Sequence, residues 1–135
     1  MIITRLWGGL GNQMFQYAAG RALSLRSGVP LKLDIYDLVD RTPSVDFVYR
    51  DCDLGLLKAP LDFASLADLG RAYEKPSSLR RRLALRYRKE LFRRNAFKEK
   101  NQQFLPELID TKKRHAYLMG YWQDNRYFEG FEDTI

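Results

Sequence analysis

The sequence predicts an α/β fold in which helices flank a parallel sheet. Two observations carry this prediction. A short apolar segment over residues 2–6 stops at a glycine cluster where a helical pattern starts at once, and a second segment with strand-like alternation follows over residues 31–36. The order of strand, helix and strand is the start of a β-α-β unit, and its right-handed crossover places the two strands parallel. A chain of 135 residues, 45% of them hydrophobic, has room for one domain with a single core.

The junction between the first strand and the first helix is expected to bring backbone close to a ligand. Glycine occurs at positions 8, 9 and 11, where the backbone is free to adopt geometries that a Cβ forbids. Asn12 stands where the N-cap of the helix is expected, and apolar residues recur at helical spacing over residues 13–27. Gly28 and Pro30 then form a stop signal. The helix N-terminus therefore faces the loop, where free N–H groups favour a phosphate or a sugar oxygen that gains negative charge.

The second expected strand carries an acid toward its C-terminal end. Asp34 lies where an acid holds a ribose hydroxyl in dinucleotide-binding folds, so it is a candidate for contact with sugar hydroxyls. The alternative is an ordinary acid at a strand end that faces solvent. The glycine loop is not the dinucleotide fingerprint, because the third glycine would fall at Met14. It is not a phosphate-binding loop either, since no Gly-Lys-Ser/Thr sequence occurs.

Two runs of residues resemble one enzyme family. Residues 8–23 read Gly-Gly-Leu-Gly-Asn-Gln-Met-Phe-Gln-Tyr-Ala-Ala-Gly-Arg-Ala-Leu, which resembles the N-terminal signature of the α-1,2-fucosyltransferases, inverting enzymes that use GDP-fucose. Residues 117–124 read Tyr-Leu-Met-Gly-Tyr-Trp-Gln-Asp, which resembles the Gly-Tyr-Trp-Gln segment of the same family. The alternative for the first run is a tight turn with Asn12 as an ordinary cap. For the second run, the alternative is a set of core or hairpin aromatics.

The resemblance implies a fold and an extent. Family members are two-domain enzymes of the GT-B type, so residues 1–135 are expected to form a Rossmann-like N-terminal domain. The family's nucleotide-binding element, His-x-Arg-x-x-Asp, lies in the second domain. Here the only histidine, His115, is followed by Ala116 and Tyr117, so that element is missing from the sequence. We therefore expect a C-terminal nucleotide-binding domain to be absent and this chain alone to be inactive.

The resemblance also implies site residues. The expected donor-binding residues are Gly9, Gly11, Asn12 and Gln13. The expected acceptor-binding residues are Tyr121, Trp122 and Gln123, because aromatic faces pack against the apolar faces of sugars.

The implied reaction transfers fucose with inversion from GDP-fucose to a galactoside hydroxyl on a glycan, without a metal or another cofactor. The catalytic residues are not assigned. Asp34 and Asp124 are candidates for the general base, unless the base lies beyond residue 135. The alternative function is a stand-alone nucleotide- or sugar-binding module without catalysis.

Most of the net charge of +6 is concentrated over residues 79–100, which contain ten Lys and Arg against two Glu. An apolar stripe at four-residue spacing predicts an amphipathic helix with a basic face; it comprises Leu79, Leu83, Tyr87 and Leu91. The favoured interpretation is a solvated helix face, followed by peripheral contact with anionic membrane lipid. A nucleic-acid partner is not expected, because no base-reading pattern accompanies the charge.

Two further features bear on metals and localisation. Asp51-Cys52-Asp53 has the form of the Asp-x-Asp pair that holds a divalent metal in the other main glycosyltransferase fold, but such pairs are common and no metal role is expected. Cys52 is the only cysteine and therefore favours a reducing compartment. With no signal peptide and no apolar stretch long enough to span a bilayer, we expect a bacterial-type cytoplasmic protein, peripheral to the inner membrane if the basic helix binds lipid.

Overall fold

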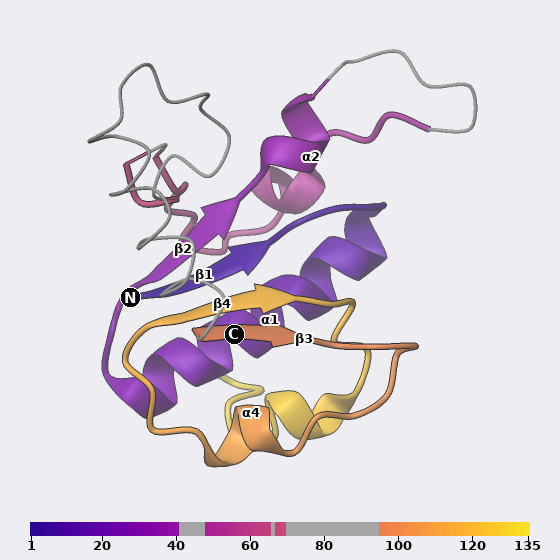
Figure 1. The fold of residues 1–135 in the computed structure, drawn as a ribbon. Coiled ribbons are helices and arrows are strands. Elements are labelled where there is room, and N and C mark those ends of the chain that lie inside the picture. The colour runs from indigo at the N-terminus through magenta and orange to yellow at the C-terminus, as the bar shows by residue number, and fades with distance from the viewer. Residues whose placement is uncertain (41–47, 66, 70–94) are drawn as a thin grey trace, which may run out of the picture.

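A four-stranded parallel sheet forms the centre of the structure, a computed structural model that describes residues 1–40, 48–65, 67–69 and 95–135 (Figure 1). The strands are β1 (Ile2–Arg5), β2 (Leu31–Asp34), β3 (Ala96–Lys98) and β4 (Ala116–Met119), in the order β2-β1-β4-β3. Every neighbouring pair is parallel, so all four carboxyl ends share one edge of the sheet. The predicted α/β, Rossmann-like arrangement is confirmed.

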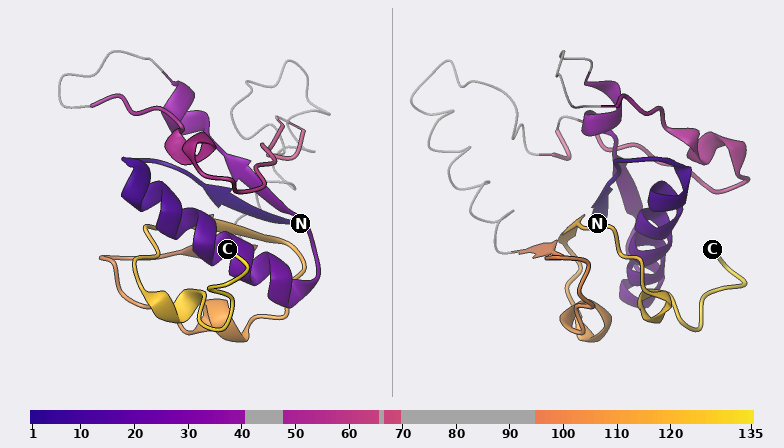
Figure 2. Two further views of the ribbon diagram at one scale, coloured as in Figure 1. Left: turned by 180° about the vertical axis from the view of Figure 1, so that it is seen from behind. Right: turned by 90° about the vertical axis from the view of Figure 1, so that its right-hand side faces the viewer.

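Helix α1 (Leu10–Ser27) packs along one face of this sheet (Figure 2). The helix and the sheet approach closely at Gly20, where a Cβ would lie 2.0 Å from Thr4 Oγ1 on β1. Helix α1 ends at Gly28, whose φ of 61° is left-handed, as the expected stop signal requires. The core between helix and sheet contains Ile2, Leu6, Tyr17, Ala19, Leu23, Leu31, Leu33 and Leu118, together with other buried residues.

The start of α1 differs from the prediction. The N-cap is Gly9, which makes no side-chain capping bond, and Asn12 lies inside the first helical turn. The interpretation of Asn12 as an ordinary cap is therefore wrong. Its side chain is left for another role.

The remaining described elements are short. They are α2 (Tyr36–Val39), the 3-10 helix η1 (Asp53–Leu56), α4 (Glu107–Asp110) and the 3-10 helix η2 (Asn125–Tyr127). The second strand ends at Asp34 rather than at residue 36, because α2 begins there. Most of the expected basic helix falls outside the described residues. The prediction of a helix is wrong for the last part of this range, because residues 96–98 form β3, where Phe97 pairs with Leu118 of β4.

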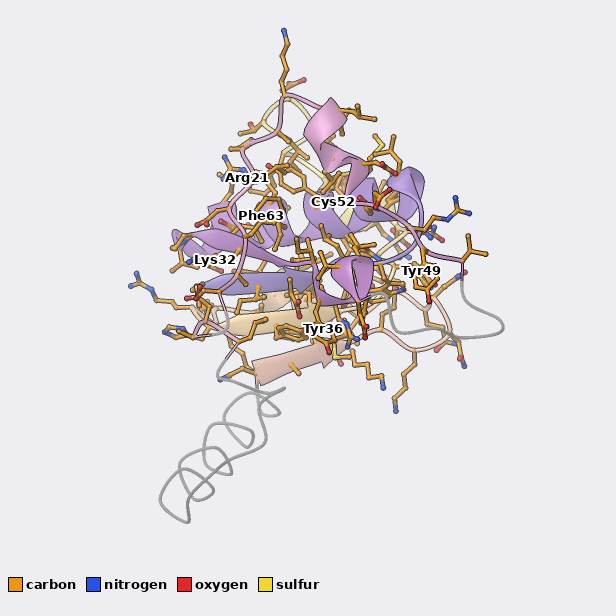
Figure 3. All side chains as sticks on the ribbon, turned by 90° about the horizontal axis from the view of Figure 1, so that it is seen from above. Arg21, Lys32, Tyr36, Tyr49, Cys52 and Phe63 are labelled. Atoms are coloured by element: carbon orange, nitrogen blue, oxygen red, sulfur yellow. The ribbon has the colours of Figure 1, made fainter. Side chains whose placement is uncertain are left out.

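A short segment extends the sheet at the edge formed by β2. The Leu33 N–H donates to Asp62 O at 2.8 Å, and the Ala64 N–H donates to Leu33 O at the same distance. Lys32 and Phe63 consequently lie near one another along this edge (Figure 3). Lys32 Nζ reaches Asp68 Oδ2 at 2.8 Å and ties the following turn to β2. Within the described ranges, no helix combines the length and apolar character needed to cross a bilayer.

The substitution Gly20→Ala is expected to destabilise the protein, although alanine is the better helix former. The new Cβ would crowd the β-branched Thr4 side chain and Leu31 Cδ1, and such overpacking costs about 1–3 kcal/mol against a propensity gain of about 1 kcal/mol. Gly11→Ala, where no atom lies within 4 Å of the new Cβ, should be neutral or stabilising. Urea unfolding of both variants measures the difference. Equal stability of the two would contradict the close approach.

The contribution of the Lys32–Asp68 pair to the free energy of unfolding should depend on pH. The Lys32 ammonium, together with Ser65, lowers the pKa of the Asp68 carboxyl from 3.8 to about 2. The folded state therefore binds this proton less readily than the unfolded state, so the contribution is present above pH 4 and is lost as the pH falls through 2. The urea midpoint of wild type should exceed that of Asp68→Asn at pH 7, by a small margin since the pair is partly exposed, and the gap should close near pH 2.

Candidate functional site

The loop between β1 and α1 folds back onto the first turn of the helix. Gly8 has a φ of 78°, in the left-handed region, and a Cβ at this position would lie 2.6 Å from Asn12 Nδ2. The left-handed conformation therefore favours glycine at position 8, and a side chain there would displace the Asn12 amide. The adjacent Gly9 and Gly11 face open space, because no atom lies within 4 Å of a Cβ built on either.

Two buried glutamine side chains hold this loop through hydrogen bonds to its backbone. Gln13 Nε2 donates to Gly8 O at 2.9 Å and to Asp51 O at 2.8 Å, and Gln13 Oε1 accepts from the Asp53 N–H at 3.0 Å. Gln16 Oε1 accepts from the Trp7 N–H at 3.1 Å. Both glutamine side chains are 0% exposed. Gln13, expected to touch the donor, instead uses its amide to hold backbone, and its side chain has no exposed surface for a ligand.

The second run begins as strand β4 and continues into a tight turn. Trp122 has a φ of 57°, which is unusual for a residue with a side chain. Its ring is 0% exposed and packs edge-on against Tyr127, with the centroids 5.2 Å apart. In this structure Trp122 is therefore a core aromatic, which was the alternative interpretation. Its ring has no exposed surface with which to contact an acceptor. Tyr121 is half-buried and Gln123 is exposed.

The two runs meet at the carboxyl ends of the neighbouring strands β1 and β4. Gln123 Nε2 donates to Asn12 Oδ1 at 2.7 Å. The rings of Trp7 and Tyr121 lie with their centroids 5.3 Å apart, tilted by 58°. We call these four residues the rim: Trp7, Asn12, Tyr121 and Gln123. In open parallel sheets, ligands bind outside the carboxyl ends of the strands, which is where the rim lies.

The rim retains polar atoms that a ligand can use. Among the described residues, Asn12 Nδ2 and Gln123 Oε1 have no hydrogen-bond partner. The first turn of α1, which begins beside the rim, contains no acidic residue. A donor amide and the positive end of a helix dipole therefore face the same region, an arrangement suited to a negatively charged oxygen.

The candidate acids are both engaged. Asp34 is 1% exposed, so neither a solvent-facing acid nor a freely accessible sugar contact describes it. Its Oδ2 accepts from the Tyr117 hydroxyl at 2.6 Å, and its Oδ1 accepts from the Tyr36 N–H at 3.0 Å. Asp124 pairs with Arg126 at 2.6 Å, and this hydrogen bond lowers the pKa of the Asp124 carboxyl, which weakens it as a base. Asp34 is buried and hydrogen-bonded, and Asp124 is paired with Arg126, so neither acid presents an open carboxylate oxygen to a substrate.

An apolar cavity of about 570 Å³ lies along the first turns of α1. Its lining includes Gly11, Met14, Phe15, Leu54, Leu57 and Phe128. Gly11 thus faces the cavity, whereas Asn12, the next residue, faces Gln123. The expected donor residues point in different directions from one helical turn.

The Asp51-Cys52-Asp53 segment serves as an anchor for Gln13 through its backbone. Burial raises the pKa of the Cys52 thiol, so the thiolate that metals prefer is disfavoured. In the part of the chain that the structure describes, no group of three or more His, Cys, Asp or Glu side chains is placed to hold a metal ion.

Glu99, at the end of β3, is a residue that the sequence reasoning missed. Its Oε2 accepts from the Tyr121 N–H at 2.7 Å and from the Trp122 N–H at 2.9 Å. The basic run of residues 79–100 concealed it as one of two acids on an expected helix. Strand β3 has only three residues, Ala-Phe-Lys, which do not alternate, so no local pattern in the sequence marked the strand or the acid that follows it.

The chain is similar to an alpha-1,2-colitosyltransferase of Escherichia coli. The two share 29% identity over 128 residues, which cover 95% of this chain but only 41% of that protein. No protein-family model and no solved structure matches the chain. The chain is therefore a distant relative of a glycosyltransferase and spans less than half the length of that relative.

Two neighbouring substitutions should separate the structural amide from the rim amide. Gln13→Ala removes three hydrogen bonds to backbone, one with the loop at Gly8 and two with the segment at Asp51 and Asp53, and is expected to cost about 2–4 kcal/mol of unfolding free energy. Asn12→Ala removes one bond at the surface and gains helix propensity, so its cost should stay below about 1 kcal/mol. Urea unfolding measures both. If Asn12→Ala proved the more destabilising, the assignment of roles would be reversed.

Proposed function

We propose that this chain forms one wall of the substrate cleft of an inverting glycosyltransferase that resembles the α-1,2-fucosyltransferases. The reaction would transfer a sugar such as fucose from a GDP-sugar to a galactoside hydroxyl. One observation carries the proposal. The two runs that resemble the family meet at the carboxyl ends of adjacent strands, through the 2.7 Å hydrogen bond between Asn12 and Gln123, which are 111 positions apart.

The similarity to a glycosyltransferase supports the same class of reaction. The name of that relative specifies an α-1,2 linkage, which agrees with the linkage of the family that the two runs resemble. The name also specifies colitose, so a colitose donor is the natural competitor to GDP-fucose in any assay.

In the proposed reaction, the acceptor oxygen attacks the anomeric carbon as the bond to the diphosphate oxygen breaks. GDP leaves with the bonding electron pair, and the acceptor hydroxyl proton passes to a base that these residues do not identify. Asn12 Nδ2 and the first N–H groups of α1 would donate to the leaving diphosphate or to the transferred sugar. Tyr121 and Gln123 would contact the acceptor. Gln13 and Trp122, both buried, would hold the rim in place.

The test is calorimetric titration of GDP and GDP-fucose, followed by transfer to a β-galactoside. Both are measured on the 135-residue chain and on a longer natural chain that contains these residues. A GDP-linked colitose donor is assayed in parallel. We expect transfer by the longer chain only. Asn12→Ala should lower kcat/KM by about 100-fold, because it removes a donor to developing charge. Gln103→Ala, which removes an exposed amide between β3 and α4, serves as the control and should leave transfer unchanged.

Each alternative has its own outcome. Tight binding of GDP by the 135-residue chain, without transfer in any longer form, would favour a stand-alone nucleotide- or sugar-binding module. Transfer from the colitose donor in preference to GDP-fucose would keep the reaction class and change the sugar. Transfer that is indifferent to Asn12→Ala would remove the rim from the mechanism.

A further inference from the structure

We infer that Glu99 is a positioning residue, whose carboxylate fixes the turn after β4 and thereby sets the distance and orientation of the two halves of the rim. It directly follows β3, and it is distant in sequence from both halves of the rim, the pair Trp7 and Asn12 and the pair Tyr121 and Gln123. It accepts from the backbone N–H groups of Tyr121, a rim residue, and of Trp122, which follows it. Its catalytic consequence rests on the proposed function, whereas its geometric consequence does not.

The contacts of Glu99 are concentrated on two successive N–H groups. The single oxygen Oε2 accepts from Tyr121 N at 2.7 Å and Trp122 N at 2.9 Å. Charge-assisted bonds of this kind are roughly twice as strong as bonds between neutral groups. A carboxylate thus holds the peptide units on both sides of Tyr121 in one orientation.

The turn held in this way is one that the chain would not adopt readily by itself. Trp122 has left-handed backbone at a φ of 57°, which costs energy for a residue with a Cβ. Gly120 is packed so closely against Glu99 that a Cβ there would lie 2.5 Å from Glu99 Cβ. The strained conformation therefore persists beside a carboxylate that satisfies its N–H groups at short range.

The orientation of the turn decides what reaches the rim. Because Trp122 turns into the core, Tyr121 is left against Trp7 and Gln123 is left against Asn12. Release of the Glu99 contacts would allow Trp122 to leave the left-handed region. Rotation of the backbone at that residue would carry Gln123 away from Asn12.

The carboxylate is itself held by the core. The Tyr127 hydroxyl lies 3.5 Å from Glu99 Oε1 and accepts from the Leu105 N–H at 2.6 Å. Burial raises the pKa of Tyr127 to about 12, so the hydroxyl stays protonated and can donate to Glu99 at neutral pH. Glu99 thus connects the buried aromatic cluster at Tyr127 with the turn that contains Tyr121.

The test compares Glu99→Ala, Glu99→Gln and the control Glu107→Ala in the 135-residue chain. Glu107 is an exposed glutamate in the first turn of α4. Nuclear magnetic resonance at a temperature where all variants are folded would follow the side-chain amide signals of Asn12 and Gln123 and the cross-peaks between the rings of Trp7 and Tyr121. Urea midpoints are recorded in parallel.

We expect Glu99→Ala to lose the ring cross-peaks and shift both amide signals. Glu99→Gln keeps a carbonyl oxygen at the same reach and should restore them, and Glu107→Ala should leave them unchanged. Loss of stability in Glu99→Ala with the rim signals intact would overturn the inference and leave a structural role only. Failure of Glu99→Gln to restore the signals would overturn it as well.

A second readout uses the longer chain in the transfer assay. Glu99→Ala should lower kcat/KM by about 10- to 100-fold through misplacement of the rim, with recovery in Glu99→Gln. If wild type transferred no sugar, the proposed function would fail while the resonance measurement still decided the positioning role. Normal transfer by Glu99→Ala would overturn the catalytic consequence of the positioning role while the proposed reaction stood, and the resonance measurement would still decide the geometric consequence.

Discussion

The parallel pairing of β1 with β4 is the constraint on which the candidate site depends. Its register sets Ile2 opposite Ala116 and Thr4 opposite Leu118, so both strands end at the same level. The chain then turns after each strand through a left-handed residue, Gly8 after β1 and Trp122 after β4. Any other register would leave Asn12 and Gln123 without their contact, whatever the conformation of each loop.

The amide side chains near the rim divide according to helical geometry. Gln13 and Gln16 are three residues apart and therefore share one face of α1, the face that meets the loop and the segment that contains Asp51. Asn12 precedes Gln13 by one residue and points about 100° away around the helix. The same short run thus both builds the loop and presents one polar group outside it.

The local patterns in the sequence were sufficient for the first strand, the first helix, the second strand and their parallel crossover. Two of the failures share a cause in contacts between distant segments. Asp34 is buried because it meets Tyr117, 83 positions away, and β3 forms because it pairs with β4. The cap at Asn12 was expected from side-chain preference, yet the backbone of Gly9 begins the helix. Of the expected site residues, the sequence could not tell which would be turned inward, since a period of 3.6 does not reveal the neighbours of each face.

The segment from Gln123 to Tyr127 touches α1 near both ends of the helix. Gln123 reaches Asn12 in the first turn, and the Arg26 guanidinium in the last turn donates to Tyr127 O at 3.1 Å. The length of this segment must therefore match the distance between its two contacts on α1, at Asn12 and at Arg26. Insertions and deletions should therefore be tolerated poorly between these two contacts and more readily in the exposed turn around Gly130, where evolution or protein engineering has freedom to vary the chain.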